Sequence, residues 1–220
     1  MESRRGAQTA HSSRKLAFSG MSVLVAIAMA RTKEFDENEV LDRAICLFRK
    51  RGFNATSFGE LTSELGVSRQ SLYDTFGDKH AFFHAALRRY RQKAIGHFRQ
   101  VLATPGPVRP VLQELFDSHL SYICSQGSLG CLMINSMIEQ APHDGDTQAE
   151  ALANAREIEG LLAQRLAQAQ REGDLAAEKD PVALARYLFH ILLAVGVAAR
   201  GLGDREGLRD TVRLALRTLD

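Results

Sequence analysis

Apolar side chains recur at the spacing of an α-helix along nearly the whole chain, and this periodicity restricts the fold more than any other feature. A first run ends at Gly52 after a basic turn and comprises Val40, Leu41, Ala44, Ile45 and Phe48. Similar runs follow as far as residue 219, and none has the alternating pattern of a strand. Between them, Asp78 and Asp180 are expected to cap helices, and a Pro-rich linker at 103–110 and a loop at 125–130 are expected. The sequence therefore predicts an all-α protein, and 220 residues are enough to bury a core.

The charges are divided unevenly between the two halves of the chain. Residues 1–100 carry 17 Lys and Arg against 10 Asp and Glu, a net charge of +7. Residues 101–220 carry 11 against 16, a net charge of −5. A basic first half favours a polyanionic partner there, and nucleic acid is the commonest one.

The stretch ELGVSRQSLYDTFGDKHAFF, residues 64–83, lies inside the basic half. Ser57 and Glu60 form a capping-box pattern for one short helix, and Gly66-Val67 ends that helix. Ser68 then caps a second short helix in which Leu72 faces inward, and no acidic residue occurs before Asp74. Two short capped helices joined by a tight turn are typical of a helix-turn-helix, whose second helix enters the major groove of DNA.

Residues 35–87 resemble the DNA-binding domain of the TetR family of transcriptional repressors. The resemblance rests on elements that keep their order and spacing together: Ala44, Leu47-Phe48, Gly52-Phe53, Thr56-Ser57, Gly66-Val67-Ser68, Leu72-Tyr73, Phe76 and Lys79. It implies a three-helix helix-turn-helix domain at 31–87 and a larger helical domain at 88–220 that binds an effector and dimerises. The function implied is a ligand- or redox-responsive repressor that binds a palindromic operator as a homodimer and is released by its effector.

The resemblance also implies which residues touch double-stranded DNA. Phosphate contacts fall on Thr56, Ser57, Tyr73 and Lys79, and base contacts fall on Ser68, Arg69, Gln70 and Ser71. Each has a plainer alternative: Ser68 as a helix cap only, Tyr73 as partly core, and Lys79, Arg69 and Gln70 as solvated surface. Asp74 departs from the family pattern and either accepts from a cytosine, orients Arg69 or faces solvent.

The last two helical segments are the expected dimer surface. Residues 181–201 are apolar nearly all round, which predicts burial on most sides. Small residues that permit close helix approach are Ala194, Gly196, Ala198 and Ala199. Packed with the final helix and the same pair from a second copy, this helix would form a four-helix interface; the alternative is burial within one chain.

The effector site is expected around the segment GCLMINSMIEQ, residues 130–140. Cys131, Asn135 and Glu139 follow one another at helical spacing, so a thiol, an amide and a carboxylate would share one face. The segment also resembles a TetR subgroup with Gly-Cys-Leu here, some of whose members sense electrophiles or oxidants through cysteine. Cys131, with Cys124, is therefore either a thiol switch or a pair of small core residues. His190 is either a ligand contact or a core histidine, and Cys46 is expected to be structural.

Other classes of function lack support in the sequence. Neither a nucleophile–base pair nor a phosphate loop indicates an enzyme, and a purely architectural DNA binder would not need so large a second domain. Three irregularly spaced cysteines and scattered histidines such as His119 and His143 predict no metal and no cofactor. Residues 1–30 are expected to be a disordered or untranslated extension, with Met21 and Met29 as alternative starts. Its apolar run 21–30 resembles a weak signal-peptide core, but it is too short to span a bilayer. The irregular cysteines favour a reducing compartment, so a cytoplasmic protein with no membrane partner is expected.

Overall fold

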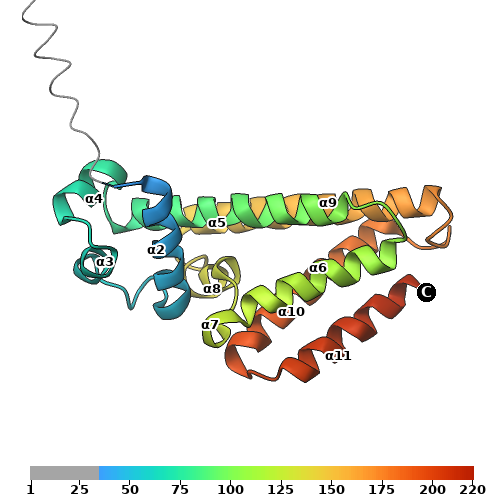
Figure 1. The fold of residues 1–220 in the computed structure, drawn as a ribbon. Coiled ribbons are helices and arrows are strands. Elements are labelled where there is room, and N and C mark those ends of the chain that lie inside the picture. Colours follow the sequence, from blue (N-terminus) through green and yellow to red (C-terminus); the bar gives the residue numbers. More distant parts are fainter. Residues whose placement is uncertain (1–34) are drawn as a thin grey trace, which may run out of the picture. The chain divides into compact units, whose positions relative to one another are not determined.

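The fold was examined in a computed structural model that describes residues 35–220, except for the side chains of residues 126 and 128. The extension expected at 1–30, with its apolar run and alternative starts, lies outside the described residues. Every regular element within 35–220 is a helix (Figure 1), so the all-α prediction is confirmed for this part of the chain.

Three short helices form the helix-turn-helix unit: α2 (Glu37–Arg51), α3 (Phe58–Leu65) and α4 (Arg69–Phe76). The predicted caps are present. Ser57 accepts from the Glu60 N–H while Glu60 bonds the Ser57 N–H, and Ser68 accepts from the Ser71 N–H. The three helices close around fully buried side chains, namely Phe48, Leu61, Leu65, Leu72 and Phe82.

Helix α5 (Lys79–Leu102) joins this unit to the rest of the chain. Asp78 caps it, accepting from the Ala81 N–H at 2.8 Å, as the sequence predicted. Its first turns pack on α2 and α4, and it also packs on α6, α8 and α9. The boundary expected at residue 87 falls inside this continuous helix, so α5 belongs to both parts of the chain.

The remaining helices pack against α5 or against one another. They are α6 (Val108–Ile123), α7 (Ser125–Ser128), α8 (Leu132–Glu139), α9 (Gly145–Arg171), α10 (Pro181–Gly201) and α11 (Arg205–Leu216), followed by a 3₁₀ turn at Arg217–Leu219. The linker expected at 103–110 is shorter than predicted, because α6 begins at Val108 and accommodates Pro110 in its first turn. The loop expected at 125–130 contains the short helix α7.

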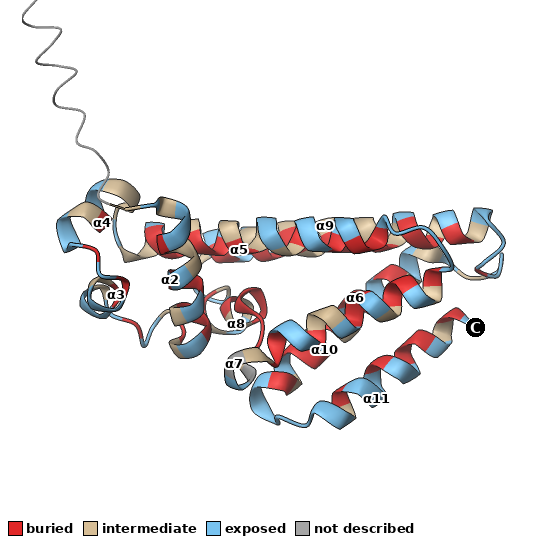
Figure 2. Cartoon of the chain, viewed as in Figure 1, coloured by how far each residue is buried: buried red, intermediate tan, exposed pale blue. Residues whose placement is uncertain are grey.

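Helix α10 is buried on one side only, so the prediction of burial on most sides is wrong for the single chain (Figure 2). It has the length and mean hydropathy, 1.9, of a membrane-spanning helix, yet it packs against α6, α8, α9 and α11 as a core helix does. Two of the small residues assigned to the dimer are used inside the chain: Ala199 is fully buried and Gly196 packs against Ile134. Ala194 is exposed, so close approach by a second copy remains possible only at part of the predicted stripe.

Candidate nucleic-acid interface and effector pocket

The first turn of α4 presents polar side chains to solvent. Ser68, Arg69 and Gln70 are exposed, and no acidic residue lies in this turn. A helix N-terminus of this kind favours an anion, because the positive end of the helix macrodipole lies there. The Ser71 N–H donates to the Ser68 hydroxyl at 3.0 Å, so the capping role of Ser68 is confirmed, while its predicted DNA contact stays a prediction.

Asp74, which the sequence left unassigned, holds Gln70. The Gln70 amide donates to the Asp74 carboxylate at 2.6 Å across one helical turn. Arg69 does not meet Asp74 in this way; its guanidinium lies 5.6 Å from the centre of the Phe58 ring on α3. Asp74 therefore orients the amide of Gln70 rather than the guanidinium of Arg69.

Thr56 and Ser57 differ in how accessible they are. The Thr56 hydroxyl is buried and donates to the Gly52 carbonyl at 2.6 Å, so its side chain supports the turn before α3 and does not reach a phosphate. This corrects the prediction for Thr56. Ser57 is exposed at the start of α3, where its hydroxyl belongs to the capping box.

Tyr73 lies in the second turn of α4, and Lys79 is the first residue of α5. Tyr73 is 58% exposed, which excludes the alternative that it is a core residue. The Lys79 ammonium lies 4.2 Å from the centre of the Phe53 ring. Desolvation lowers the Lys79 pKa, and the charges of Glu139 and Glu60 oppose that shift.

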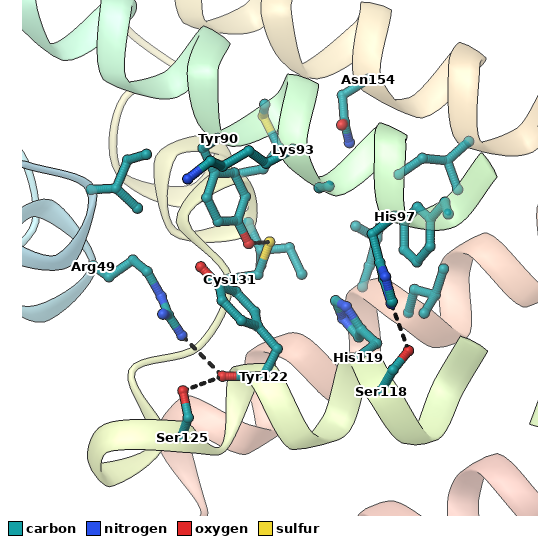
Figure 3. A pocket seen from close by; sticks show the side chains of 18 of the residues that line it. Arg49, Tyr90, Lys93, His97, Ser118, His119, Tyr122, Ser125, Cys131 and Asn154 are labelled. Carbon is teal, nitrogen blue, oxygen red and sulfur yellow. Dashed lines mark hydrogen bonds between the residues drawn. The ribbon is translucent and has the colours of Figure 1, made fainter. Parts of the chain in front are cut away.

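A cavity of about 590 Å³ lies between α2 and the helices of the C-terminal part, α5, α6, α8, α9 and α10 (Figure 3). Its lining is mostly apolar, with a few polar groups that converge on it. Those labelled in Figure 3 are Arg49, Tyr90, Lys93, His97, Ser118, His119, Tyr122, Ser125, Cys131 and Asn154. Its size and lining suit a small organic ligand with a few polar atoms.

Cys131 lies in this cavity at the start of α8, where the sequence placed it. It is buried, and the Tyr90 hydroxyl donates to its sulfur at 3.1 Å. Burial, the largest cause, and the neighbouring Cys131 raise the pKa of Tyr90, so the phenol keeps its proton and remains a donor.

His119 is the least satisfied polar group of the cavity. Its Nε2 is buried and has no hydrogen-bond partner within residues 35–220. Desolvation, helped by His97, lowers the pKa of His119 to about 4, so its ring is neutral near pH 7. His97 itself bonds the Ser118 hydroxyl at 2.9 Å. A ligand with one polar atom near His119 would satisfy a group that the protein leaves unpaired.

Arg49 of α2 connects the cavity to the helix-turn-helix unit. Its side chain is 2% exposed, donates to the Gly130 carbonyl at 2.8 and 3.0 Å, and donates to the Tyr122 carbonyl at 3.3 Å. Its guanidinium also lies 4.2 Å from the centre of the Tyr122 ring, which lines the cavity. Movement of Tyr122 or of the residue 130 backbone would therefore pull directly on α2.

Four residues predicted for the effector site lie elsewhere. Glu139 accepts from the backbone N–H groups of Phe53 and Asn54 at 3.0 and 2.7 Å, and Asn135 donates to the Leu129 carbonyl. Cys124 is buried outside the cavity lining, and His190 is exposed on α10, so neither predicted role of His190 holds within the single chain. Cys46, by contrast, was not predicted for the effector site but is exposed and lines the cavity, although the sequence indicated a structural role.

With this geometry established, the chain was compared with known proteins. Residues 40–86 match the model of "Bacterial regulatory proteins, tetR family", and residues 109–215 match "Tetracyclin repressor-like, C-terminal domain". The HTH-type transcriptional regulator YezE of Bacillus subtilis is 34% identical over 194 residues, which span 87% of this chain and 100% of YezE. The chain belongs to the TetR family.

Two further TetR-family relatives agree with this assignment. The HTH-type transcriptional repressor ComR of Escherichia coli is 30% identical over 189 residues, covering 85% of this chain and 90% of ComR. The structure of a cysteine mutant of the TetR family regulator CifR, complexed with 26-bp double-strand operator DNA, has a TM-score of 0.78 and 29% identity. That match covers 86% of this chain and 100% of CifR.

Sequence reasoning recognised the helix-turn-helix and missed most of the cavity. Arg49, Tyr90, His97 and His119 are spread over three helices, and only the fold shows that they converge. Helical periodicity did not indicate Arg49, because Arg51 lies closer to the centre of the apolar stripe of this helix and yet is only half-buried.

Proposed function

We propose that this TetR-family protein is a cytoplasmic homodimeric repressor that binds a palindromic operator. It leaves the operator when a ligand occupies the cavity of about 590 Å³ between α2 and the helices α5 to α10, the α2–α10 cavity. The observation that carries the proposal is that α2 is both a wall of the cavity and a part of the helix-turn-helix core. Asp42, Ile45, Cys46 and Arg49 line the cavity, while Phe48 of the same helix is fully buried in that core.

Operator recognition would use the α4 surface. Arg69 and Gln70 are exposed and match side chains that bond guanine and adenine edges bidentately. Ser68 and Ser71 flank them at base-contact positions, and Ser57, Tyr73 and Lys79 would hold phosphates around them. Thr56 would act as the support for the turn that presents Ser57.

Dimer formation would use the uncovered faces of α10 and α11. Exposed apolar side chains there are Val182 at 57%, Tyr187 at 41%, Val197 at 48% and Leu214 at 57%. Tyr187, His190, Ala194 and Val197 follow helical spacing and form one stripe on α10. A second copy would cover this stripe, and the two helix pairs would form the four-helix interface that the sequence indicated.

Effector binding would be transmitted through Arg49. A ligand in the cavity contacts Tyr122 and Cys131 on one side and α2 on the other. Any shift of Tyr122 or of the loop at 129–130 breaks or lengthens the bonds from Arg49, and α2 then moves with α3 and α4. The distance between the two recognition helices of the dimer would change, and both half-sites could not be bound together.

The effector proposed for this cavity is an electrophile that reacts with Cys131. The Cys131 thiolate would add to the β-carbon of an α,β-unsaturated carbonyl, forming a C–S bond. The thiol proton leaves to solvent, and the enolate formed takes a proton from solvent, so no oxidant is needed. The Tyr90 hydroxyl would stabilise the thiolate through the hydrogen bond that it already donates to the sulfur.

The DNA part is tested by selecting binding sites from a random duplex library with the purified protein. The wild type should enrich a palindrome, and the Arg69→Ala/Gln70→Ala double variant should lose that selectivity while remaining a dimer. Arg171→Ala, which removes an exposed arginine at the end of α9, is the matched control and should select the same site. An unchanged palindrome from the double variant would refute the base contacts.

The thiol part is tested by measuring operator release after addition of N-ethylmaleimide. Release should be lost in Cys131→Ser and kept in Cys124→Ser and Cys46→Ser. Equal release from wild type and Cys131→Ser would exclude Cys131 as the sensor while leaving operator binding untouched.

A further inference from the structure

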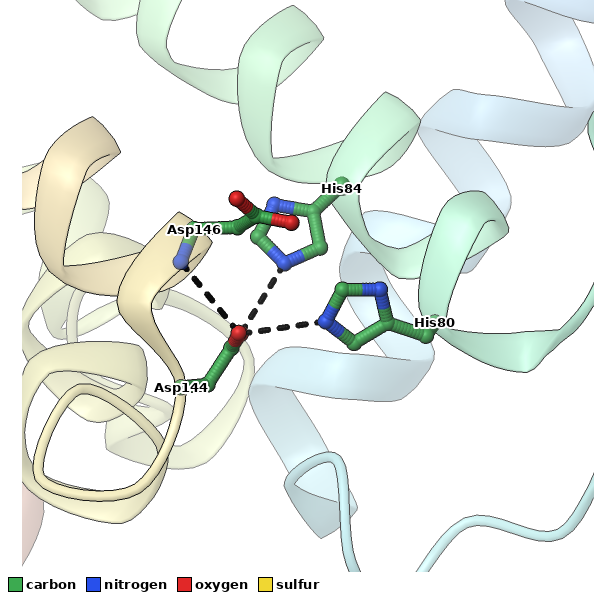
Figure 4. A group of neighbouring side chains, drawn as sticks. All are labelled: His80, His84, Asp144 and Asp146. Carbon is green, nitrogen blue, oxygen red and sulfur yellow. Dashed lines mark hydrogen bonds and ion pairs between the residues drawn. The ribbon is translucent and has the colours of Figure 1, made fainter.

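Two histidines and two aspartates meet between the first turns of α5 and the start of α9 (Figure 4). His80 and His84 occupy adjacent turns of α5, directly after the recognition helix. Asp144 and Asp146 lie at the start of α9. One ligand atom from each of the four side chains lies within 4.8 Å of the others.

The arrangement converges on a single oxygen. The Asp144 Oδ2 atom lies 3.1 Å from His84 Nε2, 3.2 Å from His80 Nε2 and 2.5 Å from the Thr147 hydroxyl, and the Thr147 N–H also points to it at 3.3 Å. A carboxylate oxygen has two lone pairs, so four donors exceed what it can accept well. If both imidazoles instead present the lone pair of Nε2 to Asp144, acceptor atoms face one another. A cation at the centre of the cluster is then needed to hold them together.

The distances suit a transition-metal ion. Zinc binds imidazole nitrogen and carboxylate oxygen at about 2.0–2.2 Å, so neighbouring ligand atoms of a tetrahedral site lie about 3.4 Å apart. The two histidine-to-Asp144 distances of 3.1 and 3.2 Å are close to this value. Histidines four residues apart on a helix are a familiar pair of ligands, because one helical turn brings both to the same face.

Charge and access also favour a cation. The cluster brings two carboxylates, Asp144 and Asp146, beside the two imidazoles. Asp146 is exposed, and His80, His84 and Asp146 line an open groove through which an ion can arrive. Two arginines also line the groove: Arg91 is paired with Glu150 and Glu157 at 3.2 and 2.9 Å, and Arg88 is exposed.

We propose that His80, His84, Asp144 and Asp146 form a binding site for a divalent first-row transition-metal ion such as zinc. Imidazole together with carboxylate selects this class over magnesium or calcium, which prefer oxygen ligands alone. The ion joins the first two turns of α5 to the start of α9, and so ties the helix that follows the recognition helix to the C-terminal part. This site departs from the expectation of no metal.

The test uses the full chain stripped with chelator and then titrated with Co²⁺ and Zn²⁺ under reducing conditions. The wild type should bind one ion per chain, show visible Co²⁺ d–d absorption without a thiolate charge-transfer band, and melt at a higher temperature with Zn²⁺. His80→Ala and His84→Gln should each weaken binding at least tenfold. His143→Asn, which changes an exposed histidine next to Asp144, is the control and should bind as the wild type does.

Several outcomes would overturn the site. They are absence of binding at micromolar metal, wild-type affinity in either His80→Ala or His84→Gln, and a thiolate charge-transfer band that Cys131→Ser abolishes. His80 tolerates this test well, because its side chain is 44% exposed and its removal leaves no buried cavity. Equal melting temperatures of His80→Ala and wild type in chelator would establish that the variant is folded.

Discussion

Removing the Glu139 carboxylate should destabilise the turn between α2 and α3. This carboxylate accepts from the Phe53 and Asn54 N–H groups at 3.0 and 2.7 Å, and it can do so only because residue 52 is glycine. A Cβ atom at residue 52 would lie 2.7 Å from Glu139 Oε2. Gly52 also has φ 86° and ψ 174°, a combination that is essentially restricted to glycine.

The expected magnitude follows from these bonds. A hydrogen bond to a charged group contributes about 1.5–3 kcal/mol, with less for a solvent-exposed partner. The Phe53 N–H is partly buried and the Asn54 N–H is exposed, so we expect Glu139→Ala to lower the free energy of unfolding by about 2–3 kcal/mol in total. Glu139→Gln keeps one carbonyl oxygen as an acceptor and should cost about 1 kcal/mol.

Urea unfolding, followed by circular dichroism, measures both values. Glu114→Ala, which changes an exposed glutamate on α6, is the control and should stay within about 0.5 kcal/mol of wild type. Gly52→Ala should cost about 1–3 kcal/mol in backbone strain and also displace the carboxylate. The double variant should therefore cost less than the sum of the two single variants. A change below about 0.5 kcal/mol for Glu139→Ala, or full additivity, would refute the reasoning.

Three further results are expected. The pKa of His119 is lowered to about 4 in the folded protein, so as the pH falls the unfolded chain binds a proton at this residue first. The free energy of unfolding should therefore fall as the pH drops from about 6.5 to 4. In urea titrations, His119→Gln should remove up to about 3 kcal/mol of that fall. Asp74→Ala should free the Gln70 amide and broaden base preference in the selected operator without loss of phosphate-dependent affinity; an unchanged motif would contradict this. Val197→Glu should convert the dimer to monomer in analytical ultracentrifugation, whereas Glu178→Gln, outside the stripe, should not.

Local features of the fold could be read from the sequence because short-range chemistry decides them. The caps by Ser57, Ser68, Asp78 and Asp180 each depend on residues two or three positions apart, and all four are present. The apolar stripe of α2 likewise predicted the burial of Val40, Ala44, Ile45 and Phe48, although Leu41 is only half-buried and the buried Arg49 was not predicted.

Long-range partners could not be read in this way. Glu139 shares a helical face with Cys131 in sequence, yet its carboxylate meets a backbone 86 positions earlier, and the absence of a side chain at residue 52 decides that contact. The expectation of no metal overlooked the four-residue spacing of His80 and His84, and their third partner, Asp144, lies 60 positions from His84. Helical periodicity tells which residues face inward, and it does not tell which helix they face.

The hydrogen bonds of Arg49 contribute about as much free energy as release of a repressor from its operator requires. A hundredfold loss of operator affinity corresponds to about 2.7 kcal/mol, within the usual range of allosteric coupling. Arg49 makes three hydrogen bonds to carbonyls, two to Gly130 and one to Tyr122, and a bond from a charged donor contributes about 1.5–3 kcal/mol when buried. A ligand or adduct that breaks one or two of them therefore changes the preferred position of α2 by enough free energy for release. Glu139 holds the chain at residues 53–54, just beyond the same C-terminal end of α2, and of these two contacts only that of Arg49 borders the cavity. Occupation of the cavity should thus displace the C-terminal end of α2 relative to the Glu139 contact, and Glu139→Ala should weaken the response to effector as well as the stability of the chain.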